Sequence, residues 1–469
     1  MKKFKLVISV VCILLCMLPL VCMSFAKTET TTQNRKLAQM PLLVNDEKIN
    51  FQYLQQLGNY FEDHYAGKNF MVNADSVIQG DLFKVSNADT VVKGNNGWLY
   101  YADTLDDYMS KAKLSEKGVC NAARNIYLMQ TYVESKNAKF VLAVAPNKNS
   151  LYGENMPYYY SSKYNGEKTV KPFVKQLNAK NINNVDLFSL FDKNSETLYL
   201  KRDSHWNNKG AMLVYNDIMS NLNVAHNDYS TVSSVREKTA VGDLNKMLYP
   251  LSAQPEWNYY YQTDDRYNYE YVTDTHGTDD PWIETKSSST NGSLLMFRDS
   301  FGDSLLPFFA REFSNAYFSK GVPYSLESYM ENYAPDYVVV EKVERNIDEF
   351  AFDPPVLSLP SDHKINDSCE YAENKADFSV SSYEGDANYI MINGTIDDAY
   401  IDNESDIFVC VNDKVYSAFS ISDDATDNGF RVYLKKDDVN AMSDVCVMVS
   451  SKGKDRIVKK EKIDFTQFV

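Results

Sequence analysis

Histidine and cysteine are scarce in this sequence, with five and seven copies among 469 residues. No two cysteines stand at the short CxxC-type spacing that is typical of metal sites. The sequence therefore predicts neither a metal centre nor a cofactor. Any reaction that depends on histidine also has few candidate residues.

Acidic residues outnumber basic residues in this sequence. The chain has 48 Lys and Arg against 64 Asp and Glu, a net charge of -16, and no run rich in Lys and Arg. Proteins that bind nucleic acid usually present a basic surface to the phosphates. Nucleic acid is therefore not an expected partner. The length and the 44% hydrophobic content fit a folded protein of two or three domains.

Long hydrophobic runs are absent beyond the N-terminus. The N-terminal run is preceded by three lysines and ends in small residues: Lys2, Lys3, Lys5, residues 6–26, Ser24 and Ala26. This pattern predicts that residues 1–26 are a signal peptide, cut after Ala26, or an uncleaved membrane anchor. Either alternative places the rest of the chain outside the cytoplasm, secreted or held at the outer face of the membrane. Residues 27–48 are expected to form a spacer.

The cysteines fall into two groups. Cys12, Cys16 and Cys22 lie in the N-terminal run, and four remain for the folded part: Cys120, Cys369, Cys410 and Cys446. A disulfide among the last three is possible in an exported protein, but the sequence does not pair them. Buried free thiols are the alternative.

Short apolar strands alternate with helical segments in the middle of the chain. The expected strands are 140–144, 185–187, 294–297, 316–318 and 337–340, and the expected helices are 115–135, 169–179, 208–222 and 304–313. This alternation is typical of an α/β fold with a mainly parallel sheet covered on both faces. We expect this domain to span residues 49–350, with an amphipathic helix at 51–70 packed against it.

Two regions break the alternation. Residues 229–286 form a polar insertion rich in Tyr and Asp, which favours a lid or binding loop. Residues 360–469 lose the helical period and show short β-like segments separated by turns. They are expected to form a small β-sandwich, with carbohydrate binding as its candidate role.

His205 is the first candidate for chemistry. It lies in Asp203-Ser204-His205-Trp206, just before an expected helix. An acid two residues before a histidine can hold the imidazole in one tautomer and leave its other nitrogen free to take a proton. Such a pair alone is a weak signal, because it also occurs as a helix cap or a surface pair.

Ser300 is the second candidate. Residues 294–297 lead directly into Arg298-Asp299-Ser300-Phe301-Gly302, which places the serine at the turn between strand and helix, where backbone N–H groups converge. Gly302-Asp303-Ser304-Leu305 spells the GDSL signature of another esterase group, so Ser304 is a rival nucleophile. We favour Ser300, because Ser304 lies further from the strand and suits a helix cap.

These motifs together resemble a known family. They are Gly97-Trp98-Leu99, Val144-Ala145-Pro146-Asn147-Lys148, Asp203-Ser204-His205-Trp206, Asp299-Ser300-Phe301-Gly302 and Pro335-Asp336-Tyr337-Val338-Val339 with Glu344-Arg345. The set, over about residues 50–350, resembles the SGNH-hydrolase-like domain of the alginate-type polysaccharide O-acetylation proteins, which include the DHHW proteins. Ser204 and Arg298 depart from the family pattern, where a His and a Gly are usual.

The resemblance implies a flavodoxin-like α/β fold and a Ser-His-Asp triad. Ser300 would be the nucleophile, His205 the base and Asp203 the residue that orients it. The remaining candidates are the weaker oxyanion and substrate-binding residues Phe301, Gly302, Asn147, Lys148, Arg298 and Trp206. Lys148 and Arg298 could hold an anionic glycan, but a structural ion pair is the role we favour for each.

The implied activity is transfer of acetyl groups to an exported polysaccharide, with a membrane-bound O-acyltransferase as partner and acetyl donor. Two alternatives stay open. A carbohydrate esterase would use the same triad with water as acceptor. A glycan-binding scaffold would keep the fold without catalysis.

Overall fold

The computed structural model describes residues 6–11, 13–14, 17, 23, 37–45, 48–80, 86–111, 114–161, 168–261, 268–364 and 369–468. Within these ranges, no helix is both long and apolar enough to cross a membrane. The predicted cleavage site after Ala26 and most of the predicted spacer lie outside the described residues. The predictions for that segment therefore stay predictions.

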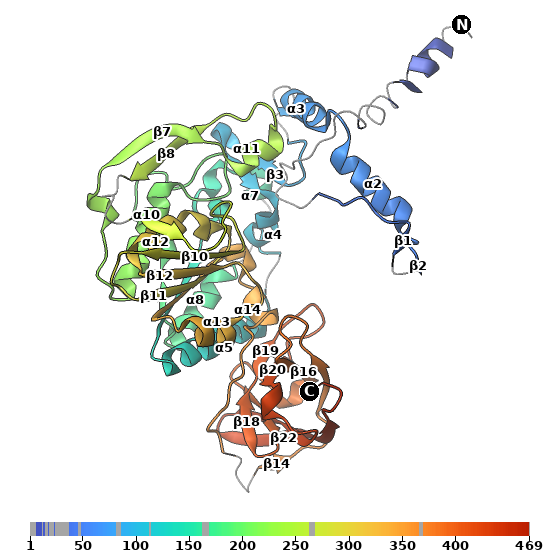
Figure 1. Cartoon of the computed structure of the whole chain (residues 1–469), viewed down its shortest axis with the longest axis vertical. Coiled ribbons are helices and arrows are strands. Elements are labelled where there is room, and N and C mark those ends of the chain that lie inside the picture. The colour runs from blue at the N-terminus through green and yellow to red at the C-terminus, as the bar shows by residue number, and fades with distance from the viewer. Residues whose placement is uncertain are drawn as a thin grey trace.

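The first folded elements differ from the expected single helix at 51–70. Two helices form instead, α2 (Tyr53–His64) and α3 (Lys68–Ile78), and Gly67 between them has a φ of 82°. The side chains of Phe51 and Leu54 are 95% and 80% exposed. Figure 1 shows α2 standing away from the α/β part of the chain. The expectation that this segment packs along its length was therefore wrong.

A seven-stranded sheet forms the centre of the molecule. Its order is β6-β5-β13-β11-β12-β10-β9. The first five strands run parallel, and β10 and β9 join antiparallel at one edge. The strands are β5 (Lys139–Ala145), β6 (Asn184–Val185), β9 (Tyr269–Tyr271), β10 (Trp282–Ser287), β11 (Ser293–Phe297), β12 (Asn315–Ser319) and β13 (Tyr337–Val343). The predicted α/β class is confirmed, but the end of the insertion is part of the sheet.

Helices cover both faces of this sheet because the strands are apolar on both sides. In β5, Phe140 and Leu142 face one hydrophobic cluster, whereas Val141 and Ala143 face the other. The first face is covered by α5 (Glu116–Ser135), α8 (Val170–Ala179), α13 (Leu326–Tyr333) and α14 (Glu349–Phe352). The second is covered by α9 (Leu187–Asp192), α10 (Asn208–Asn221) and α12 (Leu306–Glu312).

The insertion forms a β-hairpin-like pair and a short helix in addition to its sheet strands. β7 (Ser234–Ala240) pairs antiparallel with β8 (Glu256–Tyr261), and α11 (Asp243–Leu248) lies between them in sequence. A second antiparallel pair, β3 (Val91–Lys93) with β4 (Leu99–Tyr101), packs against α11. Figure 1 shows β7 and β8 at the far side of the α/β part from the C-terminal strands.

The C-terminal region is a β-sandwich, as predicted. A five-stranded sheet, β14-β22-β21-β17-β18, faces a four-stranded sheet, β15-β16-β20-β19, across one hydrophobic cluster. The strands are β14 (Glu370–Tyr371), β15 (Ala376–Ser382), β16 (Tyr389–Ile396), β17 (Asp406–Val411), β18 (Lys414–Ser417), β19 (Phe419–Ile421), β20 (Gly429–Lys435), β21 (Met442–Ser451) and β22 (Lys454–Asp464). Cys410 and Cys446 are opposite each other on β17 and β21, and both are free thiols.

The sandwich is joined to the α/β part by buried contacts. The side chain of Asn125, on α5, donates to the carbonyl oxygens of Phe350 and Ser420 at 2.8 Å and accepts from the N–H of Ser420 at 2.9 Å. Tyr389 and Phe419 of the sandwich belong to the same hydrophobic cluster as α5. The two parts therefore share a continuous core.

Candidate active site

A tight loop brings Asp203 and His205 together. Tyr199 and Trp206 form an isolated antiparallel bridge, and the N–H of Asn207 donates to the carbonyl of Leu198 at 2.8 Å, so residues 199–206 form a closed loop. Asn207 then caps α10 by accepting from the N–H of Gly210 at 2.9 Å. His205 therefore stands at the mouth of a helix, as the sequence indicated.

Asp203 holds the imidazole of His205 through one oxygen. Its Oδ1 accepts from the backbone N–H of His205 at 2.9 Å and lies 2.7 Å from Nδ1 of the ring. A carboxylate can only accept here, so Nδ1 carries the proton. The other ring nitrogen, Nε2, is thereby left as an acceptor.

The hydroxyl of Ser300 lies next to Nε2 of His205. This serine opens a short 3-10 helix (Ser300–Ser304) directly after β11, at the carboxyl end of the parallel strands. Asp299 fixes this turn, because its carboxylate accepts from the N–H of Phe301 and, across on β13, from the N–H of Val343, each at 2.8 Å. The Oγ of Ser300 lies 2.8 Å from Nε2 of His205.

Ser304, the rival serine, has different partners. Its Oγ accepts from Nε1 of Trp206 at 2.5 Å and donates to the carbonyl oxygen of Phe301 at 3.1 Å. No histidine of the described residues bonds to it. The geometry thus favours Ser300 as the activated hydroxyl.

The electrostatics of the pair follow from burial and hydrogen bonding. Burial alone would lower the pKa of His205, but the hydrogen bond and the charge of Asp203 outweigh it and raise that pKa above its usual range. Burial alone would raise the pKa of Asp203, but the hydrogen bonds and charge of His205 lower it to about 2. Asp203 is therefore ionised at neutral pH, which stabilises a protonated imidazole.

Three predicted substrate contacts are structural instead. Asn147 is fully buried, and it bonds to Asp107, Glu344 and Arg345. Arg298 is 1% exposed, and its guanidinium bonds to Asp303 and to the carbonyl of Asp280.

Lys148 is 4% exposed, and burial lowers its pKa to about 8. Its Nζ donates to the carbonyl oxygens of Leu200, Lys201 and Asp203, so it holds the loop that carries the acid. Burial thus favours the structural role for Lys148 and Arg298 over contact with a glycan, although Lys148 bonds to carbonyls rather than to an acid.

Phe301 and Gly302, the residues after Ser300, shape the turn that carries it. Phe301 is buried, its ring lies edge-on to His205 and Trp206, and its N–H is occupied by Asp299. The N–H groups of Ser300 and Gly302 are the oxyanion donors that remain from the prediction. A Cβ at Gly302 would lie 2.6 Å from Cβ of Arg298, so only glycine fits that turn.

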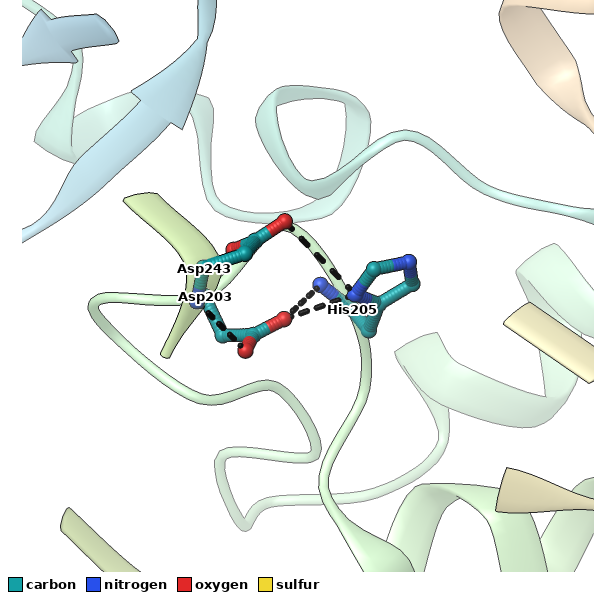
Figure 2. A group of neighbouring side chains, drawn as sticks. All are labelled: Asp203, His205 and Asp243. Atoms are coloured by element: carbon teal, nitrogen blue, oxygen red, sulfur yellow. Dashed lines mark hydrogen bonds and ion pairs between the residues drawn. The ribbon is translucent and has the colours of Figure 1, made fainter. Parts of the chain in front are cut away.

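Asp243 is a residue of the site that the sequence did not indicate. This first residue of α11 comes from the insertion and lies beside the loop, with Oδ2 3.9 Å from Nδ1 of His205 (Figure 2). Among the described residues, Asp203, His205 and Asp243 are the group whose ligand atoms lie close enough together, within 4.8 Å, to hold a metal ion. The Nδ1 and Oδ1 atoms that such an ion would need already bond to each other.

Two adjoining cavities lie at and beside the serine. One of about 500 Å³ contains Ser300, His205 and Trp206. The other, of about 740 Å³, lies along β7 and β8 and shares Leu200 and Tyr259 with the first. The sequence pointed to the insertion as a binding loop but not to the individual side chains that line it.

The comparisons with known proteins agree with the resemblance drawn from the motifs. Residues 91–287 match the sequence model of a family described as the SGNH hydrolase-like domain of acetyltransferase AlgX. The match covers less than half of the chain. It includes Asp203, His205 and Asp243 and ends before Ser300. No curated protein matches the sequence.

Several solved structures are similar in fold. PatB1 of Bacillus cereus has 19% identity and a TM-score of 0.45, over 56% of this chain and 99% of that one. The O-acetyltransferase domain of Pseudomonas putida AlgJ has 18% identity and a TM-score of 0.37, over 55% and 92%. AlgX of Pseudomonas aeruginosa has 14% identity and a TM-score of 0.36, over 74% and 86%. At scores this low the likenesses carry no argument about function. The segment that holds Asp203 and His205 is therefore similar in sequence to the SGNH hydrolase-like domain of acetyltransferase AlgX.

Proposed function

We propose that this protein is an O-acetyltransferase that moves acetyl groups onto hydroxyls of a polysaccharide outside the cytoplasm. One observation carries the proposal. The Oγ of Ser300 lies 2.8 Å from Nε2 of His205, whose Nδ1 lies 2.7 Å from Asp203. This is the arrangement of an activated serine with an oriented base. The match to an acetyltransferase family supports acetyl as the group transferred.

The reaction proceeds in two transfers. Ser300 attacks the carbonyl carbon of the acetyl donor while His205 takes the hydroxyl proton, and the donor leaves with that proton. The acetyl group then rests on Ser300 as an ester. A sugar hydroxyl attacks this ester, gives its proton to His205 and leaves as the acetylated sugar, and the proton returns to Ser300.

The acceptor polysaccharide would lie in the two adjoining cavities. Trp257 on β8 is 50% exposed, and the Arg236 guanidinium lies 5.3 Å from its ring and 5.9 Å from that of Tyr259. Exposed aromatic rings of this kind suit stacking on sugars.

The larger cavity also has a surplus of cationic side chains. It is lined by Lys201, Arg202, Arg236 and Lys238 against Glu196 and Glu256. Glu196 pairs with Lys209, and Glu256 accepts from the backbone N–H groups of Lys201 and Arg202. A sugar that carries an acidic group would therefore find a surplus of positive charge in the cavity that adjoins the one holding Ser300.

The N-terminal apolar run supports export, and the acetyl group would come from a membrane-bound O-acyltransferase at the same membrane. Water in place of the sugar would make the protein a carbohydrate esterase with the same acetyl-serine intermediate. Adding an oligosaccharide acceptor separates the two, because a transferase gives acetylated sugar at the expense of free acetate.

A pair of variants tests the site. Ser300→Ala should remove acetyl release from p-nitrophenyl acetate and acetyl transfer to the oligosaccharide, by about 10⁴-fold or more. Ser304→Ala should keep most activity, because it loses a hydroxyl that bonds only to Trp206 and Phe301. Mass spectrometry should find the acetyl label on the peptide that contains Ser300. A label on Ser304, or full activity in folded Ser300→Ala, would refute the proposal.

A further inference from the structure

Ser204 faces away from Asp203 and towards α11. Its Oγ donates to Oδ2 of Asp243 and lies 3.1 Å from Nδ1 of His205. Its backbone N–H donates to the other oxygen of Asp243 at 2.8 Å. The serine therefore connects the base to a second carboxylate (Figure 2 shows the two acids on either side of the ring edge).

Asp243 is held tightly against this loop. Its own N–H donates to Oδ2 of Asp203 at 3.0 Å, and the N–H of Asn245 donates to the carbonyl of Arg202 at 3.0 Å. The side chain of Asp243 is 22% exposed, the same as that of His205. These hydrogen bonds thus hold the first turn of α11 against Arg202 and Ser204, the residues before and after Asp203.

We propose that Asp243, acting through Ser204, is a positioning residue that holds His205 and stabilises its protonated form during acetyl transfer. The inference rests on the proposed function. It goes further, because it adds a second carboxylate to the base and gives a role to Ser204, where this chain departs from the family pattern.

The hydrogen bonds give the direction of the effect. The Nδ1–H of His205 faces Oδ1 of Asp203 at 2.7 Å and Oγ of Ser204 at 3.1 Å. Because Ser204 uses its own hydrogen on Asp243, its oxygen offers lone pairs to the ring. When His205 takes the proton of Ser300, the positive charge that forms lies 3.9 Å from the carboxylate of Asp243. An anion at this distance favours the protonated imidazole.

The pKa of His205 depends on the other charged groups around it as well as on Asp243. Asp203 and Asp243 raise its pKa, and Arg345 lowers it. Asp303 also lines the cavity with His205, and burial raises the pKa of this carboxyl even though Arg298, Lys320 and His205 oppose the shift. Lys148 lies behind Asp203, bonded to its carbonyl. Removing the charge of Asp243 therefore removes one of the anions that favour imidazolium, while Arg345 stays.

The test measures the pKa of His205 directly. Histidine NMR titration of the full chain would follow the five rings, with His205→Gln to identify the signal. Asp243→Asn keeps the shape and removes the charge, so the pKa of His205 should fall by about one pH unit or more. The acidic limb of kcat/KM for p-nitrophenyl acetate should move to lower pH by the same amount, and kcat at the optimum should fall about tenfold, with KM little changed.

Two further variants test whether the effect comes from the charge of Asp243 and from its contact with Ser204. Asp377→Asn removes one exposed carboxylate of the C-terminal sandwich and should leave the titration unchanged. Ser204→Ala removes the connection without changing charge. It should lower kcat severalfold, and the double variant Ser204→Ala/Asp243→Asn should be no worse than Asp243→Asn alone, since the hydroxyl and the carboxylate act on His205 as one unit.

Three results would overturn the inference. They are an unchanged titration of His205 in folded Asp243→Asn, a rise in its pKa, and additive losses in the double variant. The two titration outcomes are independent of the proposed function, because the NMR titration needs no substrate. Full activity in Ser300→Ala would refute the proposed function and leave the titration as a test of Asp243.

Discussion

Gly242 stands where the insertion touches the catalytic loop, and a single added methyl group there should disturb the base. A Cβ at this position would lie 2.2 Å from the carbonyl oxygen of Arg202, 2.6 Å from its carbon and 2.8 Å from the nitrogen of Asp203. The φ of Gly242 is -62°, which alanine adopts freely, so the effect of Gly242→Ala is one of space alone.

The size of the effect follows from these distances. Carbon atoms pack at about 3.5 to 4 Å, so the two segments must separate by about 1 Å. The atoms in the way are backbone, so no side chain can rotate to relieve the contact. Overpacking of this kind costs about 1 to 3 kcal/mol of the free energy of unfolding. A displacement of about 1 Å at Asp203 should lower kcat/KM about 10²-fold.

The measurement compares two alanine variants. Gly242→Ala and Gly58→Ala make the same chemical change, but a Cβ at Gly58, on α2, meets nothing within 4 Å. Gly58→Ala should keep activity and leave Tm unchanged or raised. Hydrolysis of p-nitrophenyl acetate and thermal unfolding would report both. Wild-type kcat/KM and Tm in Gly242→Ala would refute the reasoning, because the contact with Arg202 would then not constrain Asp203.

Four other outcomes are expected. Because Asp203 raises the pKa of His205, the fraction of neutral base falls as pH drops through that value, so a pH–rate profile of kcat/KM should decline on the acidic side with a slope of one proton. Lys148→Met leaves the carbonyls of its loop without a donor and should cost about 2 kcal/mol of unfolding free energy as well as activity, measured by denaturant unfolding and by ester hydrolysis. Arg236→Gln should raise KM for an acidic oligosaccharide and leave p-nitrophenyl acetate hydrolysis unchanged, if the cavity along β7 and β8 holds the acceptor. Asn125→Ala removes three buried hydrogen bonds and should lower Tm by several degrees without altering kcat.

The sequence predicted the parts of the fold that depend on local pattern. The strand at 140–144 and the helix at 115–135 were placed to within a residue, because apolar period and caps are local signals. The approach of His205 to Ser300 is not a local signal. The sequence placed Ser300 at the end of β11, as the structure has it, but it expected Asp203 and His205 at a neighbouring strand end, whereas they lie in the loop closed by Tyr199 and Trp206.

Other features depend on contacts that no local pattern encodes. Asp243 lies in a polar insertion, far along the chain from Asp203, with nothing nearby in sequence to mark it. Arg298 and Lys148 have the charge of ligand-binding residues, but tertiary packing buries both. The residues 51–70 have a helical period, yet the chain bends at Gly67 and leaves Phe51 and Leu54 exposed.

The contact between α5 and β19 also covers an edge strand of the sandwich. β19 is the outermost strand of its sheet, and such strands can template pairing with another chain. The amide of Asn125 gives Ser420 the donor and the acceptor that a neighbouring strand would otherwise offer. Proteolysis between α14 and β14 would let the sandwich leave α5 and open this edge. The freed C-terminal fragment should then form dimers and larger aggregates at concentrations where the intact chain stays monodisperse.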